Sequence, residues 1–255
     1  YPNVAYGHDG LPERQNVHIK NATEWTADEA GVLENTDILI RDGEFYRIGQ
    51  DLRTPSGYTV IDGTGMHVTP GIIDEHSHIA IDQGVNEGSE AITSEVRIGD
   101  VVNPDDIHIY RSLAGGTTMA QLLHGSANPI GGQAQVIKLR WGATADQMKF
   151  DAAPASIKFA LGENVKQSRY PSWLSSRYPQ TRMGVETLMR DGFTAALEYR
   201  AAQEAYRKLS RSEREKVAPP RPDYRLNTLL EILDKERFVH AHSYVQSEIL
   251  MLLRL

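Results

Sequence analysis

The chain has 255 residues, of which 40% are hydrophobic, 24% charged and 7% aromatic, and it contains no cysteine. This composition is that of a globular protein with a buried core, and it excludes disordered, collagen-like and coiled-coil chains. The net charge of −7 argues against a nucleic-acid partner, because binding to phosphate backbones depends on basic surfaces. Without cysteine, the side chains left for metal or acid–base chemistry are His, Asp, Glu and Lys.

No window of the sequence approaches the roughly 18 consecutive apolar residues of a membrane-spanning helix, and the N-terminus has no signal-like segment. We therefore expect a soluble chain and leave its compartment open between the cytoplasm and export, including the bacterial periplasm. Residues 1–15 are rich in Gly, Pro and Asn and are predicted to be a linker. The apolar run at 244–255 lacks a helix stop signal, so we expect the natural polypeptide to continue beyond Leu255.

Residues 16–70 contain short runs in which apolar and polar residues alternate, as in half-buried strands. These runs predict a small antiparallel sheet. Between two of them lies Asp42-Gly43, a pair suited to the two-residue turn that needs positive φ at both positions. The sequence therefore predicts a hairpin over Ile38–Ile48.

From Gly71 onward the pattern changes to apolar strands alternating with helices, which predicts parallel strands joined by crossover helices. The expected strands are 71–74, 117–123, 133–140, 156–161 and 237–241, and the expected helices are 104–114, 145–150, 184–209 and 226–235. For the first helix, Asn103 is the predicted N-cap, Pro104 the first helical residue, and Gly115-Gly116 the end.

Two His-x-His pairs are the strongest chemical signal. His76 and His78 follow the first apolar strand, and His240 and His242 close the strand at 237–241. Residues i and i+2 of a strand face the same side, so each pair can present two imidazoles to one metal ion. The alternative reading of each pair is two solvated surface histidines. Asp74 is a candidate for orienting a ligand imidazole, and His8, His18 and His108 are read as surface or helix-face residues.

Three further residues lie near strand ends. Lys158 is inside the apolar strand 156–161, where a lysine is costly unless it is paired or modified. Glu163 follows that strand and either completes a metal site or caps a loop. His124 opens the Gly-rich loop 125–132, which either offers backbone N–H groups to an anion or is a tight structural turn. His124 is accordingly a candidate for substrate binding.

The segment 65–78, which reads apolar-Pro-Gly-apolar-apolar-Asp-x-His-x-His at its end, resembles the amidohydrolase superfamily and in particular its imidazolonepropionase-like members. The stretches 114–118, 125–133 and 160–164 are also similar to this group. The resemblance implies an α/β fold, a (β/α)8 TIM-type barrel flanked by a small β-sandwich. Residues 16–70 would form the N-terminal part of the sandwich, and 71–255 barrel strands 1 to 5, so the barrel is partial in this chain.

The same resemblance implies that His76 and His78 are metal ligands and that the strand 5 ligand is His240 or His242, with His240 favoured. The bridging ligand would be Glu163, or Lys158 if it were carboxylated. The cofactor would be a divalent metal, Zn²⁺ by preference, with Fe²⁺ or Mn²⁺ left open. The Asp that serves the family as proton shuttle would lie beyond Leu255.

The function implied is hydrolysis of an amide or cyclic-amide C–N bond by a metal-activated water. A metal-dependent dipeptidase of prolidase or isoaspartyl type is an alternative with the same ligands, in which the loop at 79–103 would select substrate ends. Another alternative is a catalytically inactive barrel fragment or binding domain of a larger protein. The expected partner is a small-molecule amide or short peptide; a homo-oligomer is left open.

Overall fold

The computed structural model describes residues 12–168 and 176–255. By its internal contacts the chain divides into two compact units, one ending at Ile72 and the other covering Ile73–Leu255. Most of the predicted linker lies outside the described residues. None of the helices in the described ranges is both long and apolar enough to cross a membrane.

The first unit is one mixed sheet. Its strands are β1 (Val17–Trp25), β2 (Val32–Arg41), β3 (Glu44–Gly49), β4 (Thr59–Asp62) and β5 (His67–Val68). They lie in the order β3-β2-β1-β4, and β5 also pairs with β1. The prediction of a small antiparallel sheet is correct for β1, β2 and β3 and wrong for β4 and β5, which run parallel to β1. After β3 the chain crosses to the edge of β1 that β2 does not occupy. There β4 and β5 pair with β1 in the same direction.

The predicted hairpin is confirmed. Ile38 pairs with Ile48 across β2 and β3. At the turn, Asp42 has φ +55° and Gly43 has φ +84°, so both residues take the left-handed conformation that suits a tight hairpin.

His18 is fully buried in this sheet, so its prediction as a surface residue is wrong. Its Nδ1 lies 2.8 Å from the Thr54 hydroxyl, and its Nε2 lies 3.5 Å from a carboxylate oxygen of Asp37. Asp37 also accepts the backbone N–H groups of Asn21 and Leu52. Burial alone would raise the pKa of Asp37, but these hydrogen bonds and His18 outweigh it and lower the pKa. Thr54 and Asp37 thus provide polar partners for the buried imidazole of His18.

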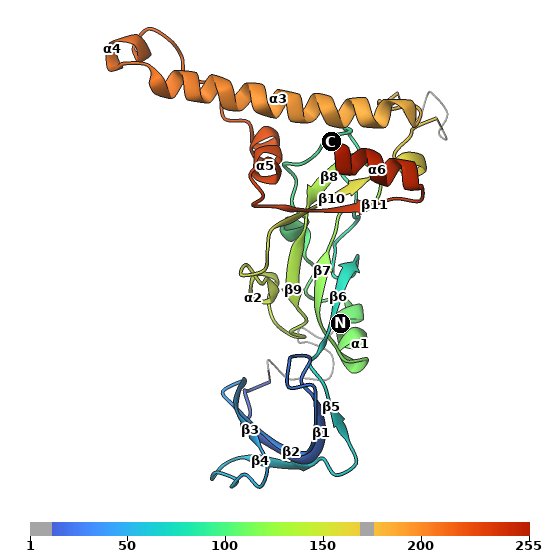
Figure 1. The fold of residues 1–255 in the computed structure, drawn as a ribbon, viewed down its shortest axis with the longest axis vertical. Helices are drawn as coiled ribbons and strands as arrows, with labels where there is room; N and C mark the ends of the chain where they lie inside the picture. The colour runs from blue at the N-terminus through green and yellow to red at the C-terminus, as the bar shows by residue number, and fades with distance from the viewer. Residues whose placement is uncertain (1–11, 169–175) are drawn as a thin grey trace. The chain divides into compact units, whose positions relative to one another are not determined.

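The second unit contains two three-stranded sheets and their helices (Figure 1). One sheet has the order β6 (Ile72–Ser77), β7 (Thr117–Leu122), β9 (Gln135–Lys138), and the other β11 (Phe238–His242), β10 (Ser156–Ala160), β8 (Ile130–Gln133). The helices are α1 (Ile107–Ala114), α2 (Ala145–Met148), α3 (Met183–Lys208), α4 (Arg211–Arg214), α5 (Tyr224–Leu233) and α6 (Gln246–Arg254), with 3-10 turns at Ile98–Val101 and Gly162–Asn164. The fold class is mixed α/β.

The predicted strand at 133–140 is two strands, β8 and β9, in different sheets. The chain changes sheet at Ala134, whose N–H still binds the carbonyl of Ser156 in β10 at 2.9 Å, and the next residues pair with β7. β7 with β9 and β8 with β10 are antiparallel pairs, whereas β10 and β11 are parallel. The prediction of parallel strands throughout is therefore wrong at β8 and β9, and it holds for β10 and β11, which are joined by a long helical excursion.

Helix α1 begins later than predicted. Its N-cap is Asp106, not Asn103, because the Asp106 carboxylate accepts the N–H of His108 at 3.0 Å. The same carboxylate accepts the N–H of Ala80 at 2.7 Å, which ties the helix start to the segment after β6. The predicted end at Gly115 is confirmed.

Successive side chains of β10 face opposite sides of its sheet, and one of these sides faces the hydrophobic core. Ile157, Phe159 and the following Leu161 belong to a hydrophobic cluster with residues of α3 and α5. Lys158 lies between Ile157 and Phe159 in the strand and therefore faces the other side of the sheet, whereas the small side chain of Ala160 also belongs to the cluster. α3, the long helix drawn in orange in Figure 1, extends past this sheet and leads to α4.

Candidate functional site

The two parallel strands β10 and β11 place polar side chains at matching levels. Lys158 is the register partner of His240, and Ala160 is the register partner of His242. Because residues two apart share a face of a strand, His240 and His242 lie on the same side as Lys158. The site is therefore built on adjacent strands that are distant in sequence.

Lys158 lies at the centre of the site. It is 1% exposed, and its Nζ lies 3.0 Å from Nε2 of His76, within hydrogen-bond distance. This contact joins β10 to β6, a strand of the other sheet. Burial lowers the pKa of Lys158, because the charged ammonium loses its hydration. Burial, followed by the charge of Lys158, also lowers the pKa values of His76, His240 and His242.

His78 completes the group on the β6 side. Its ring is edge-on to that of His76, with 5.4 Å between the ring centroids. Its Nδ1 lies 2.9 Å from the carbonyl of Leu123, at the end of β7, so Nδ1–H donates and Nε2 keeps its lone pair. Metal-binding histidines commonly have such a second-nitrogen contact to a carbonyl. The carboxylate of Asp74 accepts the backbone N–H of His76 at 3.1 Å.

Glu163 is not brought together with the histidines. It lies in the 3-10 turn after β10, where its carboxylate pairs with Lys166 at 2.5 Å and lies 3.9 Å from Arg182. The carboxylate is 47% exposed. The sequence thus predicted that Glu163 follows a strand, but it did not predict the ion pairs with Lys166 and Arg182.

His124 is buried with both ring nitrogens in hydrogen bonds. Nδ1 lies 2.9 Å from the carbonyl of Gly125, and Nε2 accepts the N–H of Glu87 at 2.8 Å. In this structure the ring connects the segment after β7 to the loop at 79–103. Two of the loop's predicted glycines, Gly131 and Gly132, lie in strand β8 and pack against this ring, so they form part of a strand and not a tight turn.

Residues that the sequence analysis missed hold the loop at 79–103 in place. The Asn128 amide donates to the carbonyls of Glu87 and Glu90 and to the Thr93 hydroxyl. Arg225 of α5 donates two hydrogen bonds to Glu95, at 2.8 and 3.0 Å. No local sequence pattern could indicate these contacts, because the partners are far apart along the chain.

Asn164 and Tyr244 are also missed residues, and both contact His242. The Asn164 amide nitrogen lies 3.1 Å from Nε2 of His242. The Tyr244 ring is edge-on to the imidazole with a centroid separation of 4.6 Å. These contacts fix the orientation of His242 at the rim of the site.

The donor types suit a divalent metal: two imidazoles lie at the end of β6 and two in β11, and the buried amine of Lys158 contacts one of them, that of His76. Within residues 12–168 and 176–255, no three His, Cys, Asp or Glu side chains are arranged to hold a metal ion. The central side chain is an amine, which is not a ligand while it is protonated. The residues fit a metal once Lys158 carries oxygen donors or another carboxylate joins them.

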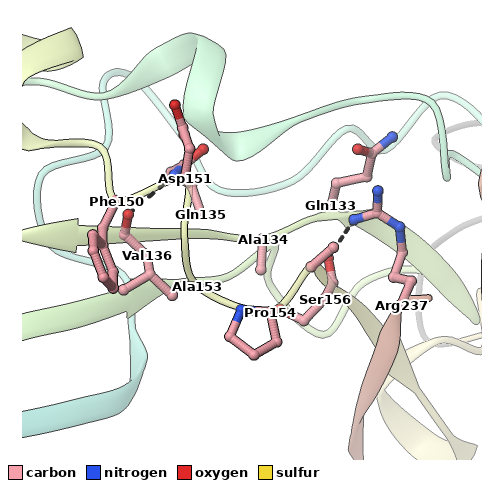
Figure 2. Close-up of a pocket in the computed structure, with 11 residues that line it drawn as sticks. Gln133, Ala134, Gln135, Val136, Phe150, Asp151, Ala153, Pro154, Ser156 and Arg237 are labelled. Atoms are coloured by element: carbon pink, nitrogen blue, oxygen red, sulfur yellow. Dashed lines mark hydrogen bonds between the residues drawn. The ribbon is translucent and has the colours of Figure 1, made fainter. Parts of the chain in front are cut away.

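A separate cavity of about 190 Å³ lies at the other end of β10 (Figure 2). Ser156, the first residue of that strand, lines it together with Gln133 and Arg237, whose guanidinium binds the Ser156 carbonyl at 3.0 Å. Lys158 and the histidines do not line this cavity. It is distinct from the histidine site.

Comparison with known proteins indicates the class of protein to which the chain is similar. No protein-family profile matches the chain. It is 30% identical over 211 residues to amidohydrolase tasK of Hapsidospora irregularis, a match that covers 70% of this chain and 21% of that protein. It is 47% identical over 49 residues to a dihydroorotase of Citrifermentans bemidjiense, over 19% of this chain and 12% of that protein.

A solved structure extends the similarity to nearly the whole chain. The crystal structure of an amidohydrolase from Thermotoga maritima superimposes with a TM-score of 0.79 and 29% identity, and it covers 93% of this chain and 61% of that one. These proteins carry the names of hydrolases that act on C–N bonds. The chain belongs to the amidohydrolase superfamily. It spans only about a fifth of tasK and a smaller share of the dihydroorotase.

Proposed function

We propose that this chain contributes the main part of the metal site of a hydrolase that cleaves amide or cyclic-amide C–N bonds. The observation that carries the proposal is the buried Lys158 with His76 at 3.0 Å and His240 beside it on the next strand. The names of the relatives, which include dihydroorotases and an allantoinase, support cyclic amides as the substrate class. The same ligands would serve a dipeptidase, so substrate choice is part of the test.

His76, His78 and His240 are the proposed ligands. His240 is preferred to His242 because it lies level with Lys158 in the sheet register. The ion is Zn²⁺ by preference, with Fe²⁺ or Mn²⁺ as alternatives. When bound, such an ion polarises a carbonyl and lowers the pKa of a bound water toward about 7.

Lys158 is the proposed source of the bridging ligand, in preference to Glu163, whose carboxylate already pairs with Lys166. An uncharged lysine amine adds to the carbon of CO₂ and loses one proton, which leaves a carbamate with two oxygen donors. Burial favours this step, because the lowered pKa of Lys158 increases the uncharged fraction of the amine. The barrel and sandwich expected for the complete protein remain part of this proposal.

The chain's own residues prepare the site before any ion is bound. The Leu123 carbonyl accepts a hydrogen bond from Nδ1–H of His78, which leaves the lone pair of Nε2 available to bind a metal ion. The Asp106 carboxylate fixes Ala80, and His124 fixes Glu87, so the segment after the His-x-His pair is anchored at both places. Fixed ligand orientation reduces the conformational entropy lost on binding.

The first test is metal content by mass spectrometry on the full-length protein, beside a His76→Ala, His78→Ala double variant. A His108→Ala variant is the control, because His108 contacts Asp106 on the α1 surface and not the site. We expect stoichiometric metal in the wild type and the control and its loss in the double variant. Dihydroorotate, allantoin and short peptides are then screened as substrates. A folded wild type that takes up no zinc, iron or manganese would refute the proposal.

A further inference from the structure

His242 lies two residues after His240, the proposed metal ligand, along strand β11. Its register partner is Ala160, whereas His240 is the partner of Lys158. Two residues along a strand correspond to about 6.6 Å, and here the step is toward the carboxyl ends of the parallel strands. In α/β folds this edge is where ligands bind. His242 is therefore placed to meet a substrate, while His240 is placed to meet a metal ion.

The contacts of His242 determine which of its nitrogens can donate. Nε2 accepts a hydrogen bond from the Asn164 amide at 3.1 Å, so in the neutral ring the proton is on Nδ1. The edge-on contact with Tyr244 restricts rotation of the ring. Among the hydrogen bonds of the described residues, none involves Nδ1 of His242, and the side chain is partly exposed. In the neutral ring, one N–H donor of a partly exposed side chain thus has no hydrogen-bond partner among the described residues.

We propose that His242 is a substrate-binding residue whose Nδ1–H donates to a carbonyl or carboxylate oxygen of the substrate, and that Asn164 is its positioning residue. The inference rests on the proposed hydrolase function, since it assigns a substrate contact at the same site. It also separates the roles of the two histidines in the second His-x-His pair: His240 binds the ion and His242 binds the substrate.

The tautomer can be tested without any activity. In the full-length protein labelled with ¹⁵N-histidine, long-range ¹H–¹⁵N spectra should show the Nδ1–H form of His242. Asn164→Asp replaces the donating amide with an accepting carboxylate, so the proton should move to Nε2. A wild-type ring in the Nε2–H form, or no change in the variant, would overturn the positioning role of Asn164.

Metal loading separates a ligand from a substrate contact. Cobalt-substituted His242→Phe should keep its metal content and its visible ligand-field spectrum, whereas His240→Phe should lose both. Loss of cobalt in His242→Phe would make His242 a ligand and refute the inference. If the wild type binds no cobalt, zinc, iron or manganese, it is the hydrolase proposal that fails, and the tautomer experiment still tests the Asn164 contact.

Binding of two probes distinguishes the substrate oxygen. Dihydroorotate carries a carboxylate and 5,6-dihydrouracil does not, but both have ring carbonyls. We expect His242→Phe and Asn164→Asp to weaken binding of at least one probe about tenfold, with partial recovery in His242→Gln, which retains a donor. Weakening confined to dihydroorotate assigns the carboxylate, and equal weakening assigns the carbonyl. Unchanged binding in both variants, or a metal-loaded wild type that binds neither probe, would contradict the proposal.

Discussion

At the scale of single residues, Asp106 connects two parts of the chain through one carboxylate. It caps α1 by accepting the His108 N–H and holds Ala80, two residues after His78. Loss of a helix cap and of a second N–H partner should cost about 2 kcal/mol. We expect Asp106→Ala to lower the free energy of unfolding by that amount, as measured by urea denaturation. Asp105→Ala, at the exposed neighbour, should change it by less than about 0.5 kcal/mol.

The contribution of Asp106 should depend on pH. Burial raises its pKa, but hydrogen bonds from His108 and Ala80 outweigh burial, and the folded-state pKa is lowered from the usual value. The carboxylate therefore stabilises the fold above the pKa of the unfolded chain, and this stabilisation is lost as the pH falls through the folded-state pKa. The difference between wild type and Asp106→Ala should shrink between neutral pH and about pH 3. A difference that is constant over this range would show that the charge is not involved.

For single residues, the sequence predicts which face of a strand a side chain occupies better than it predicts which residues that side chain contacts. The period of two places His76 with His78, Lys158 opposite the core, and His240 with His242 on one face. It does not predict that Glu163 pairs with Lys166 and Arg182, because the Arg182 contact depends on where α3 begins. It also does not predict that His18 is buried, since its partners are distant in sequence: Asp37 lies in β2 and Thr54 in the segment between β3 and β4.

At the scale of elements, strand β8 depends on its glycines. A Cβ on Gly131 would lie 2.9 Å from the Lys158 carbonyl and 3.0 Å from Nδ1 of His124. Since the carbonyl belongs to the central strand, it cannot move freely. Gly131→Ala should cost about 1–3 kcal/mol in unfolding free energy. Gly84→Ala, where a Cβ meets nothing within 4 Å, is the control. Equal thermal stability of the two variants would show that β8 yields without cost.

The loop at 79–103 should be held to the unit through Asn128. This side chain is 1% exposed and its amide donates to Glu87, Glu90 and Thr93. Asn128→Ala would remove the amide donor from the Glu87 carbonyl and the Thr93 hydroxyl, while the Glu90 carbonyl keeps its hydrogen bond from Arg177, at a cost of about 2 kcal/mol. We expect amide hydrogen exchange in the segment 86–94 to accelerate roughly 30-fold, with little change in β1 and β2 of the other unit. Exchange that is unaltered in this segment would assign its order to the arginine contacts alone.

The limits of prediction at this scale have a physical cause. Residues 133–140 are apolar enough for one continuous strand, yet Ala134 bonds to Ser156 and the chain changes sheet there. This break depends on long-range pairing, since β8 pairs with β10 and β9 pairs with β7, and no local signal in the sequence marks it. The turn at Asp42-Gly43 is predictable because its geometry is determined by the two residues themselves.

At the scale of the whole molecule, bound metal should stabilise the protein. A ligand that binds only the folded state adds about 2.7 kcal/mol at a free concentration 100 times its dissociation constant. We expect zinc added to the chelator-treated full-length protein to raise its unfolding temperature by several degrees. The His76→Ala, His78→Ala double variant should show no rise. A rise that persists in the double variant would place the stabilising ion elsewhere.

The pairing of β10 with β11 determines when the site can form. These strands are neighbours in the sheet, but residues 161–237 separate them in the chain. Closing so long a segment carries an entropic cost that must be met before the contacts of β11 are made, and such non-local pairing is slow. Packing of α3 against α5 shortens the effective distance between the two strand ends. We therefore expect the histidines of β11 to join the site late in folding, after α3 and α5 have packed together.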